Sequence, residues 1–219
     1  AMAYSESAAD IQSLYQSRTL PEALGELPGV LVQKTSNGQG SPFIRGFTGF
    51  RNVLLIDGIR LNNSVFRDGP NQYWNTVDTF AASRIEVLKG PASVLYGSDA
   101  VGGAVNVLSD IPGATKPGFS PRVLYRYSNA ESSDTIRGDL TYVDDRLRAT
   151  GGYTYKEYGD VEGGGSVGVQ PRTGYDEQAA NARVEYELSS RRTLLLGYQY
   201  VNQDDAWRTH RTIYGNGWN

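Results

Sequence analysis

Between Leu147 and Lys156 the chain reads LRATGGYTYK, in which small or apolar residues alternate with polar residues or glycine. A period of two residues is typical of a β-strand that presents two different faces. The same alternation recurs near residues 123–128, 136–142, 180–188 and 193–200, with Leu195 as an exception on the polar side. Each segment has about ten residues, the length that a tilted strand needs to cross an outer membrane.

A soluble β-sandwich is the alternative interpretation of these segments. Sandwich strands are usually shorter, about five or six residues. Their inward faces are also built from Leu, Ile and Val, whereas these segments offer Tyr, Ala and Gly. The pattern therefore favours membrane-barrel strands over a sandwich.

The connections between the segments predict an orientation. Asp144–Asp145 and Ser189–Arg191 are short and fall at one end, whereas Asn129–Asp134 and a loop of about Tyr158–Gly174 fall at the other. Membrane barrels place short turns on the periplasmic side, so the chain is expected to enter the first strand from that side. The tyrosines of these segments are expected to form two interfacial girdles, one near each end. Five strands cannot close a barrel, which predicts a fragment of a larger one.

Composition excludes several classes of protein. The 219 residues carry 21 basic and 24 acidic side chains, a net charge of −3, which argues against a nucleic-acid partner. There is no cysteine, and His210 is the only histidine, so thiol catalysis and Cys- or His-rich metal sites are excluded. No apolar run reaches the roughly 18 residues of a membrane-spanning helix. No carboxylate pair or acid–base set is recognisable, so the chain is predicted not to be an enzyme and to hold no metal.

The chain is expected to have three parts. Residues 1–18 are predicted to be a flexible lead, residues 19–117 a small α+β domain, and residues 118–219 the five strands. Within the second part, Thr19 and Glu22 form a capping-box pattern that opens a short helix through Leu27. Asp57-Gly58 is predicted to be a tight hairpin turn.

Five ordered motifs then carry a specific resemblance. They are SPFIRGF at Ser41–Phe47, VLLIDG at Val53–Gly58, RIEVLKGP at Arg84–Pro91, LYG at Leu95–Gly97, and GGAVNV at Gly102–Val107. Over about residues 19–110, their order and spacing resemble the plug domain of TonB-dependent outer-membrane receptors. The resemblance implies an α+β plug domain followed by antiparallel transmembrane β-barrel strands, a fragment of a roughly 22-stranded barrel with a plugged lumen.

The resemblance also implies a function, a location and partners. Such receptors lie in the outer membrane of Gram-negative cells and import scarce nutrients, such as ferric siderophores or haem, using TonB and its inner-membrane energising complex. The implied partners are outer-membrane lipid, the nutrient, the remaining barrel segment and, for some receptors, a bacteriocin or phage. No cofactor is implied, although the transported ligand can contain iron or another metal. No convincing TonB box stands in Ala1–Ile11, and the alternative function is a surface adhesin or docking receptor without transport.

Ligand contact is expected from three loops at the apex of the plug, Asn37–Ser41, Phe47–Asn52 and Asn63–Trp74. These loops combine flat aromatic rings with hydrogen-bonding groups, a mixture suited to recognition. For Tyr73 and Trp74 the alternative is packing against the barrel wall. The candidate ligand-binding residues are Asn37, Gln39, Phe50, Arg51, Phe66, Arg67, Asn71, Gln72, Tyr73 and Trp74.

A second set of candidates concerns how the plug is held. Arg45 and Arg84 fall on predicted plug strands, and buried guanidinium groups need carboxylate partners. By resemblance, they would pair with barrel glutamates and lock the plug in place. For Arg84 the alternative is a local pair with Glu86, two residues away.

Overall fold

The structure, a computed structural model, describes residues 2–7, 17–61, 69–109 and 117–207. Its contacts divide the chain into two compact units, residues 1–109 and residues 110–219. Each unit is described by itself. Within the described residues, no helix is both long enough and apolar enough to cross a membrane.

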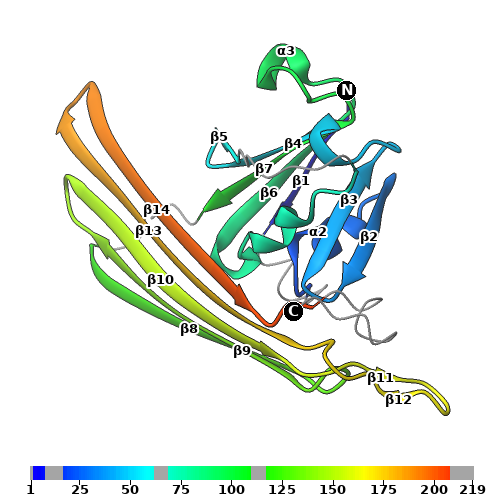
Figure 1. Cartoon of the computed structure of the whole chain (residues 1–219). Helices are drawn as coiled ribbons and strands as arrows, with labels where there is room; N and C mark the ends of the chain where they lie inside the picture. The colour runs from blue at the N-terminus through cyan, green and yellow to red at the C-terminus, as the bar shows by residue number, and fades with distance from the viewer. Residues whose placement is uncertain (1, 8–16, 62–68, 110–116, 208–219) are drawn as a thin grey trace. The chain divides into compact units, whose positions relative to one another are not determined.

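The described part of the first unit is built on a mixed five-stranded sheet with the strand order β1-β6-β7-β4-β5 (Figure 1). Strands β4 and β7 are parallel, and the other neighbours are antiparallel. The strands are β1 Met2–Ser7, β4 Asn52–Ile56, β5 Ile59–Arg60, β6 Ala82–Lys89 and β7 Gly103–Ser109.

A hairpin and several short helices complete this unit. Strands β2 (Val30–Ser36) and β3 (Gln39–Ile44) pair antiparallel and form a separate two-stranded sheet. The helices are α2 Leu20–Gly25, α3 Ser93–Tyr96, and the 3₁₀ turns η2 Gly49–Arg51, η3 Gln72–Thr76 and η4 Thr79–Ala81.

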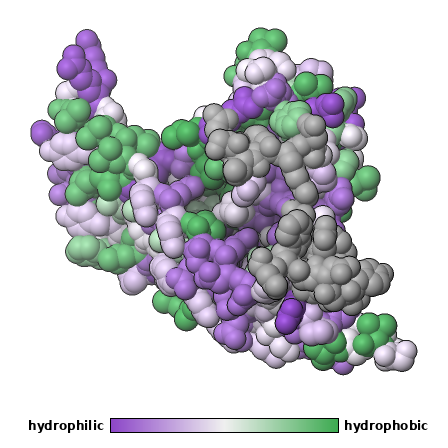
Figure 2. Space-filling view, viewed as in Figure 1, coloured by the Kyte–Doolittle hydropathy of each residue, from purple (hydrophilic) through white to green (hydrophobic). Residues whose placement is uncertain are grey.

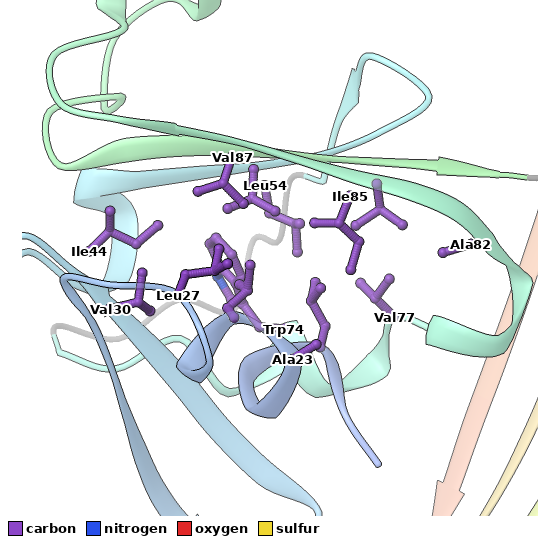
Figure 3. Close-up of a cluster of buried hydrophobic side chains, with 14 residues drawn as sticks. Ala23, Leu27, Val30, Ile44, Leu54, Trp74, Val77, Ala82, Ile85 and Val87 are labelled. Carbon is purple, nitrogen blue, oxygen red and sulfur yellow. The ribbon is translucent and has the colours of Figure 1, made fainter. Parts of the chain in front are cut away.

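The core of this unit lies between the sheet and the layer formed by α2, the hairpin and η3 (Figure 3). Alternate residues of β6, Ile85 and Val87, point into it, as the period of a strand requires. Trp74 of η3 fills its centre and is only 1% exposed. The buried members of the cluster are Leu20, Ala23, Leu24, Leu27, Val30, Ile44, Leu54, Trp74, Val77, Ala82, Ile85, Val87, Val105 and Val107.

The start of the chain differs from the sequence-based expectation. Residues 2–7 were predicted to be part of a flexible lead, but they form β1 at the edge of the sheet. Met2 stands opposite Lys89 and Ser7 opposite Arg84, so β1 covers most of the length of β6. Backbone hydrogen bonding supports an edge strand without the apolar run that sequence analysis looks for.

Two local predictions have different outcomes. Asp57-Gly58 does form the tight turn between β4 and β5, and both residues have positive φ, 51° and 78°, as a type I′ turn requires. The predicted helix ends at Gly25 instead of Leu27. The predicted capping box is formed only in part. The Thr19 side chain makes no capping hydrogen bond, and Glu22 accepts the backbone N–H of Arg18, at 3.0 Å, instead of that of Thr19.

The second unit contains five long antiparallel strands within residues 117–207, each pairing with the next along the sheet (Figure 1). They are β8 Gly118–Ser128, β9 Ser133–Val143, β10 Leu147–Tyr158, β13 Tyr175–Ser189 and β14 Arg192–Asp204. The five predicted strands are therefore confirmed, and all are longer than their alternating segments. The β8–β9 connection is only residues 129–132, which is shorter than predicted. The long connection carries its own small hairpin, β11 Glu162–Gly163 and β12 Gly168–Val169.

The long sheet has one apolar and one polar face. Hydrophobic residues gather in patches over the long strands in Figure 2. The apolar face includes Val123, Ile136, Leu140 and Leu196, which are all at least half exposed. Phe119 and Tyr142 meet near the short-turn end with ring centroids 4.8 Å apart. Tyr186 also lies near the short-turn end, Tyr198 lies at the middle of its strand, and the remaining tyrosines of this face lie nearer the opposite end: Tyr125, Tyr127, Tyr153, Tyr155 and Tyr200.

Candidate functional site

The polar face of the long sheet is held together by buried ion pairs between strands. Lys156 of β10 and Glu177 of β13 stand opposite each other, with Nζ and Oε1 2.6 Å apart. Both side chains are almost fully buried, at 2% and 1% exposure. Gln203 of β14 donates to the other oxygen of Glu177 at 2.6 Å. A single carboxylate thus joins three neighbouring strands.

A second group lies nearer the short turns. Arg137 of β9 is buried and donates to Thr154 and Asn181, each at 2.7 Å, and it pairs with Asp139. Arg122 of β8 donates to the same aspartate at 3.0 Å. These contacts run from β8 to β13 along one face. Charged groups that are buried in this way need partners, and here they find them on the same strand and on neighbouring strands of the sheet.

The combination of the two faces limits what this sheet can do. One face presents aliphatic and aromatic side chains, and the other presents paired charges and hydroxyl groups. Strands of this length with such a division are typical of a wall between lipid and a polar interior. They are not typical of a catalytic surface, because the charged groups are engaged with one another.

In the first unit, the β2–β3 hairpin is hydrogen-bonded to η3 and to the residue before it. Asn75 accepts the N–H of Gly40 at 3.0 Å, and Gln72 donates to the hydroxyl of Thr35 at 2.9 Å. The N–H of Asn71 donates to the hydroxyl of Ser41, also at 3.0 Å. The structure therefore brings together residues of two predicted apex loops. The third, Phe47–Asn52, reaches both, because the hydroxyl groups of Ser41 and Thr48 lie 3.0 Å apart and a Cβ on Gly49 would lie 2.3 Å from the carbonyl oxygen of Gly69.

Only some of the predicted ligand-binding residues lie where the β2–β3 hairpin meets η3. Asn37, Gln39, Asn71, Gln72 and Tyr73 lie at the joined turn and segment, and Tyr73 is 37% exposed. Phe66 and Arg67 lie outside the described residues.

Trp74 needs a correction, because its side chain belongs to the hydrophobic core and is only 1% exposed. Of the two interpretations offered for it, packing agrees with the structure. The packing that the structure shows is among the core residues of the first unit.

Phe50 and Arg51 lie on η2, and the backbone of Arg51 leads away from the turn at Asn37. Its carbonyl accepts the N–H groups of Val101 and Gly102, at 3.1 and 2.9 Å. A Cβ on Gly102 would lie 2.9 Å from the carbonyl oxygen of Ile44, at the end of β3 that is remote from the turn. Ligand contact by Phe50 and Arg51 stays a prediction.

The two candidate locking arginines have different environments. Arg45 and Gly46 form the tight turn from Ile44 to Phe47, with φ of 53° and 84°, and the Arg45 side chain is exposed. Arg84 pairs with Glu86 on its own strand, with Nη2 and Oε1 2.6 Å apart. The local pair is the alternative that the sequence offered for Arg84. Locking by Arg45 stays a prediction.

Comparison with known proteins matches this first unit to a family. The family model described as TonB-dependent Receptor Plug Domain matches residues 2–104. Residues 2–104 are a TonB-dependent receptor plug domain. The match begins with β1 and runs into β7, so it includes the strand that the sequence-based prediction placed in a flexible lead.

Solved receptor structures match the plug together with the long strands. The siderophore receptor PirA from Acinetobacter baumannii aligns with a TM-score of 0.72 and 24% identity, over 92% of this chain and 31% of its own. A mutant of the ferric enterobactin receptor PfeA from Pseudomonas aeruginosa, in complex with enterobactin, aligns at 0.69 and 20%, over 92% and 33%. The pyoverdine receptor FpvA from the same organism aligns at 0.71 and 15%, over 92% and 27%.

These matches show the fold: a plug domain followed by antiparallel strands of a receptor barrel. The chain spans about a third of the length of the solved structures that it matches. The expected resemblance, and the fold class that it implied, are confirmed.

Several residues that organise the plug were not predicted from the sequence. Asn75, Thr35 and Ser41 join its turn to η3, and the hydroxyl groups of Ser41 and Thr48 lie 3.0 Å apart. Each is a small polar residue that the structure buries wholly or partly. A sequence pattern does not reveal such residues, because their partners are up to 38 positions away.

Proposed function

We propose that this chain is the plug and the first barrel strands of an outer-membrane receptor that imports a scarce nutrient using the energy supplied through TonB. The observation that carries the proposal is a plug domain followed in one chain by strands with an apolar and a polar face. A plug has a purpose only where a pore must be closed and then opened. A barrel that served as a scaffold for adhesion would not need one.

We further propose that the nutrient is a ferric siderophore or a similar iron complex. The support is that similar solved structures are a siderophore receptor and a ferric enterobactin receptor. The chain itself offers hydrogen-bonding amides and a half-exposed tyrosine ring where the β2–β3 turn meets η3. Flat rings and amide groups suit a chelate that presents aromatic rings and carbonyl oxygens.

The proposed contact set on the described plug is Asn37, Gln39, Asn71, Gln72 and Tyr73. Phe66 and Arg67 are added from the sequence alone. Trp74 is omitted because its ring is buried in the core. For Arg45 we propose a carboxylate partner on the barrel, since its guanidinium is exposed on the surface of the plug.

Growth under iron limitation tests this proposal. The full-length protein that contains this chain is expressed in a strain lacking its own siderophore receptors, and growth is measured with ferric catecholates, ferric hydroxamates, ferric citrate and haem. Growth with at least one iron source, lost when TonB is deleted, is expected. Failure on every source, with the protein verified at the cell surface, would contradict iron import and favour the adhesin alternative.

A further inference from the structure

The β10–β13 connection, residues 159–174, is folded around one carboxylate. Asp160 Oδ1 accepts the backbone N–H of Thr173 at 2.7 Å and that of Gly174 at 2.8 Å. The preceding residue, Arg172, has a φ of +62°, which a residue with a side chain seldom adopts. Successive N–H groups that converge on an anion in this way form a backbone nest. Here the anion is supplied by the chain itself.

Thr173 closes the base of the connection. Its side chain is buried, and its hydroxyl accepts the N–H of Val161 and donates to the carbonyl of Gln170, each at 2.8 Å. The N–H of Gln170 in turn donates to the carbonyl of Val161 at 2.9 Å. These bonds link both ends of the connection, so its base has a defined shape.

The base is also fixed to the ends of the strands. Tyr158 and Tyr175 stand opposite each other and stack with ring centroids 4.6 Å apart, and both are about 4% exposed. A Cβ on Gly174 would lie 2.3 Å from the carbonyl oxygen of Tyr158. Glycine at position 174 is therefore required for this close approach.

Arg172 reaches from this base to the next connection at the same end of the sheet. Its guanidinium carbon lies 5.7 Å from the centre of the Trp207 ring, which is within cation–π range. Trp207 follows β14, in a turn where its N–H donates to the carbonyl of Asp205 at 2.8 Å. Asp176 at the start of β13 stands opposite Asp204 at the end of β14. The connection that carries Arg172 and the turn that carries Trp207 therefore lie at the same end of two adjacent strands.

We infer that the β10–β13 connection and the turn after β14 form one coupled body, in which Asp160 fixes the backbone of Arg172 and the Arg172–Trp207 contact transmits position from one connection to the other. Under the proposed function, this body is a preformed arm at the mouth of the receptor. Only its location outside the cell rests on that proposal. The two connections then move together or not at all. A ligand that displaces one of them also displaces the other.

The ionisation of Asp160 supports this arrangement. Burial acts to raise the pKa of its carboxyl, but hydrogen bonds from the N–H groups of Gly174, Thr173 and Arg172 outweigh burial and leave the pKa below its ordinary value. The carboxylate is therefore charged under all ordinary growth conditions, and the nest stays occupied.

Amide hydrogen exchange on the full-length protein in lipid nanodiscs tests the coupling. Arg172→Ala is expected to raise the exchange rate about threefold around residues 205–207. This is the change expected from losing the free energy of an exposed cation–π contact. Trp207→Leu is expected to raise exchange by a similar factor within residues 161–174. Asp160→Asn should raise exchange in both segments. Arg191→Ala, which removes an exposed arginine at the opposite end of the sheet, is the matched control and should change neither segment.

Conservative variants keep the inference testable if Asp160→Asn misfolds. Trp207→Phe retains a ring and should retain the coupling, and Arg172→Ala with Trp207→Leu together should change exchange no more than either alone. If Arg172→Ala and Trp207→Leu each alter exchange only in their own segment, the coupling is wrong. The assay needs no transport, so its failure would leave the proposed import intact, and a failure of import would leave the coupling intact.

Discussion

Lys156 and Glu177 form a nearly fully buried ion pair across β10 and β13, with 2.6 Å between the ammonium nitrogen and the carboxylate oxygen. Such a pair constrains the sheet because either charge alone would be very costly to bury. Register also depends on it, since a shift of β13 by one residue against β10 would turn Glu177 towards the apolar face and leave Lys156 without its partner. The pair therefore helps to explain how a sheet with so many polar side chains keeps one alignment.

Breaking this pair should destabilise the barrel strands strongly. Lys156→Met leaves the Glu177 carboxylate buried without the ammonium group, and the free energy of unfolding should fall by about 3–5 kcal/mol. Replacing both residues with methionine and leucine should cost much less. Denaturant unfolding of the full-length protein in lipid vesicles measures both variants. A double variant as unstable as the single one would contradict this reasoning.

The neighbouring residues Tyr73 and Trp74 should respond differently to truncation. Trp74→Ala removes a core side chain that is 1% exposed, so the free energy of unfolding of the plug should fall by about 3–5 kcal/mol. Tyr73→Ala should leave stability nearly unchanged and weaken ligand binding about fivefold or more. Calorimetric unfolding and ligand titration separate the two effects. Equal losses of stability would show that Tyr73 is also a packing residue.

Glycine 102 should tolerate no side chain. A Cβ there would lie 2.4 Å from the Asn52 amide oxygen and 2.5 Å from the Phe47 Cβ. Gly102→Ala should therefore lower the free energy of unfolding of the plug by about 1–3 kcal/mol. Gly164→Ala is the control, because no atom lies within 4 Å of its added Cβ. Calorimetry of both full-length variants checks the prediction, and a neutral Gly102→Ala would contradict it.

Low pH should remove the stability that the ion pairs of Glu22 with Arg18 and Lys34 contribute to the folded plug. Burial acts to raise the pKa of Glu22, but hydrogen bonds and charge attraction from Arg18 and Lys34 outweigh burial and lower it from 4.5 to about 2. A lowered carboxyl pKa stabilises the folded state above pH 4.5, and this contribution is lost as the pH falls towards 2. The stability difference between the wild type and Glu22→Gln should therefore be full at pH 6, at most about 3 kcal/mol, and vanish near pH 2. Denaturant unfolding across this range measures it, and a difference independent of pH would contradict the assignment.

Sequence patterns predicted the elements whose physics is local. The period of two identified all five long strands, because one face of each is built from apolar residues, tyrosine and glycine over much of its length. The Asp57-Gly58 turn was recognisable from two residues that tolerate positive φ. The plug motifs were recognisable as an ordered set, and the family match confirmed them.

The sequence could not predict features that depend on distant partners. β1 is an edge strand that pairs with β6, more than 75 residues away. Trp74 resembles a recognition residue in a polar loop, yet the fold buries it among side chains from α2, β2 and β6. The Lys156–Glu177 pair and the Asp160 nest both require the register of β10 against β13, which alternation alone leaves undetermined.

Energy-dependent uptake is the most direct test of the central claim, that this plug and these strands belong to an active importer. Cells expressing the full-length protein are given a radiolabelled ferric siderophore that supports their growth, with and without a proton uncoupler. The account predicts surface binding in both conditions and accumulation inside the cell only when the proton gradient and TonB are intact. Accumulation that is indifferent to the uncoupler, or binding without any accumulation, would contradict it.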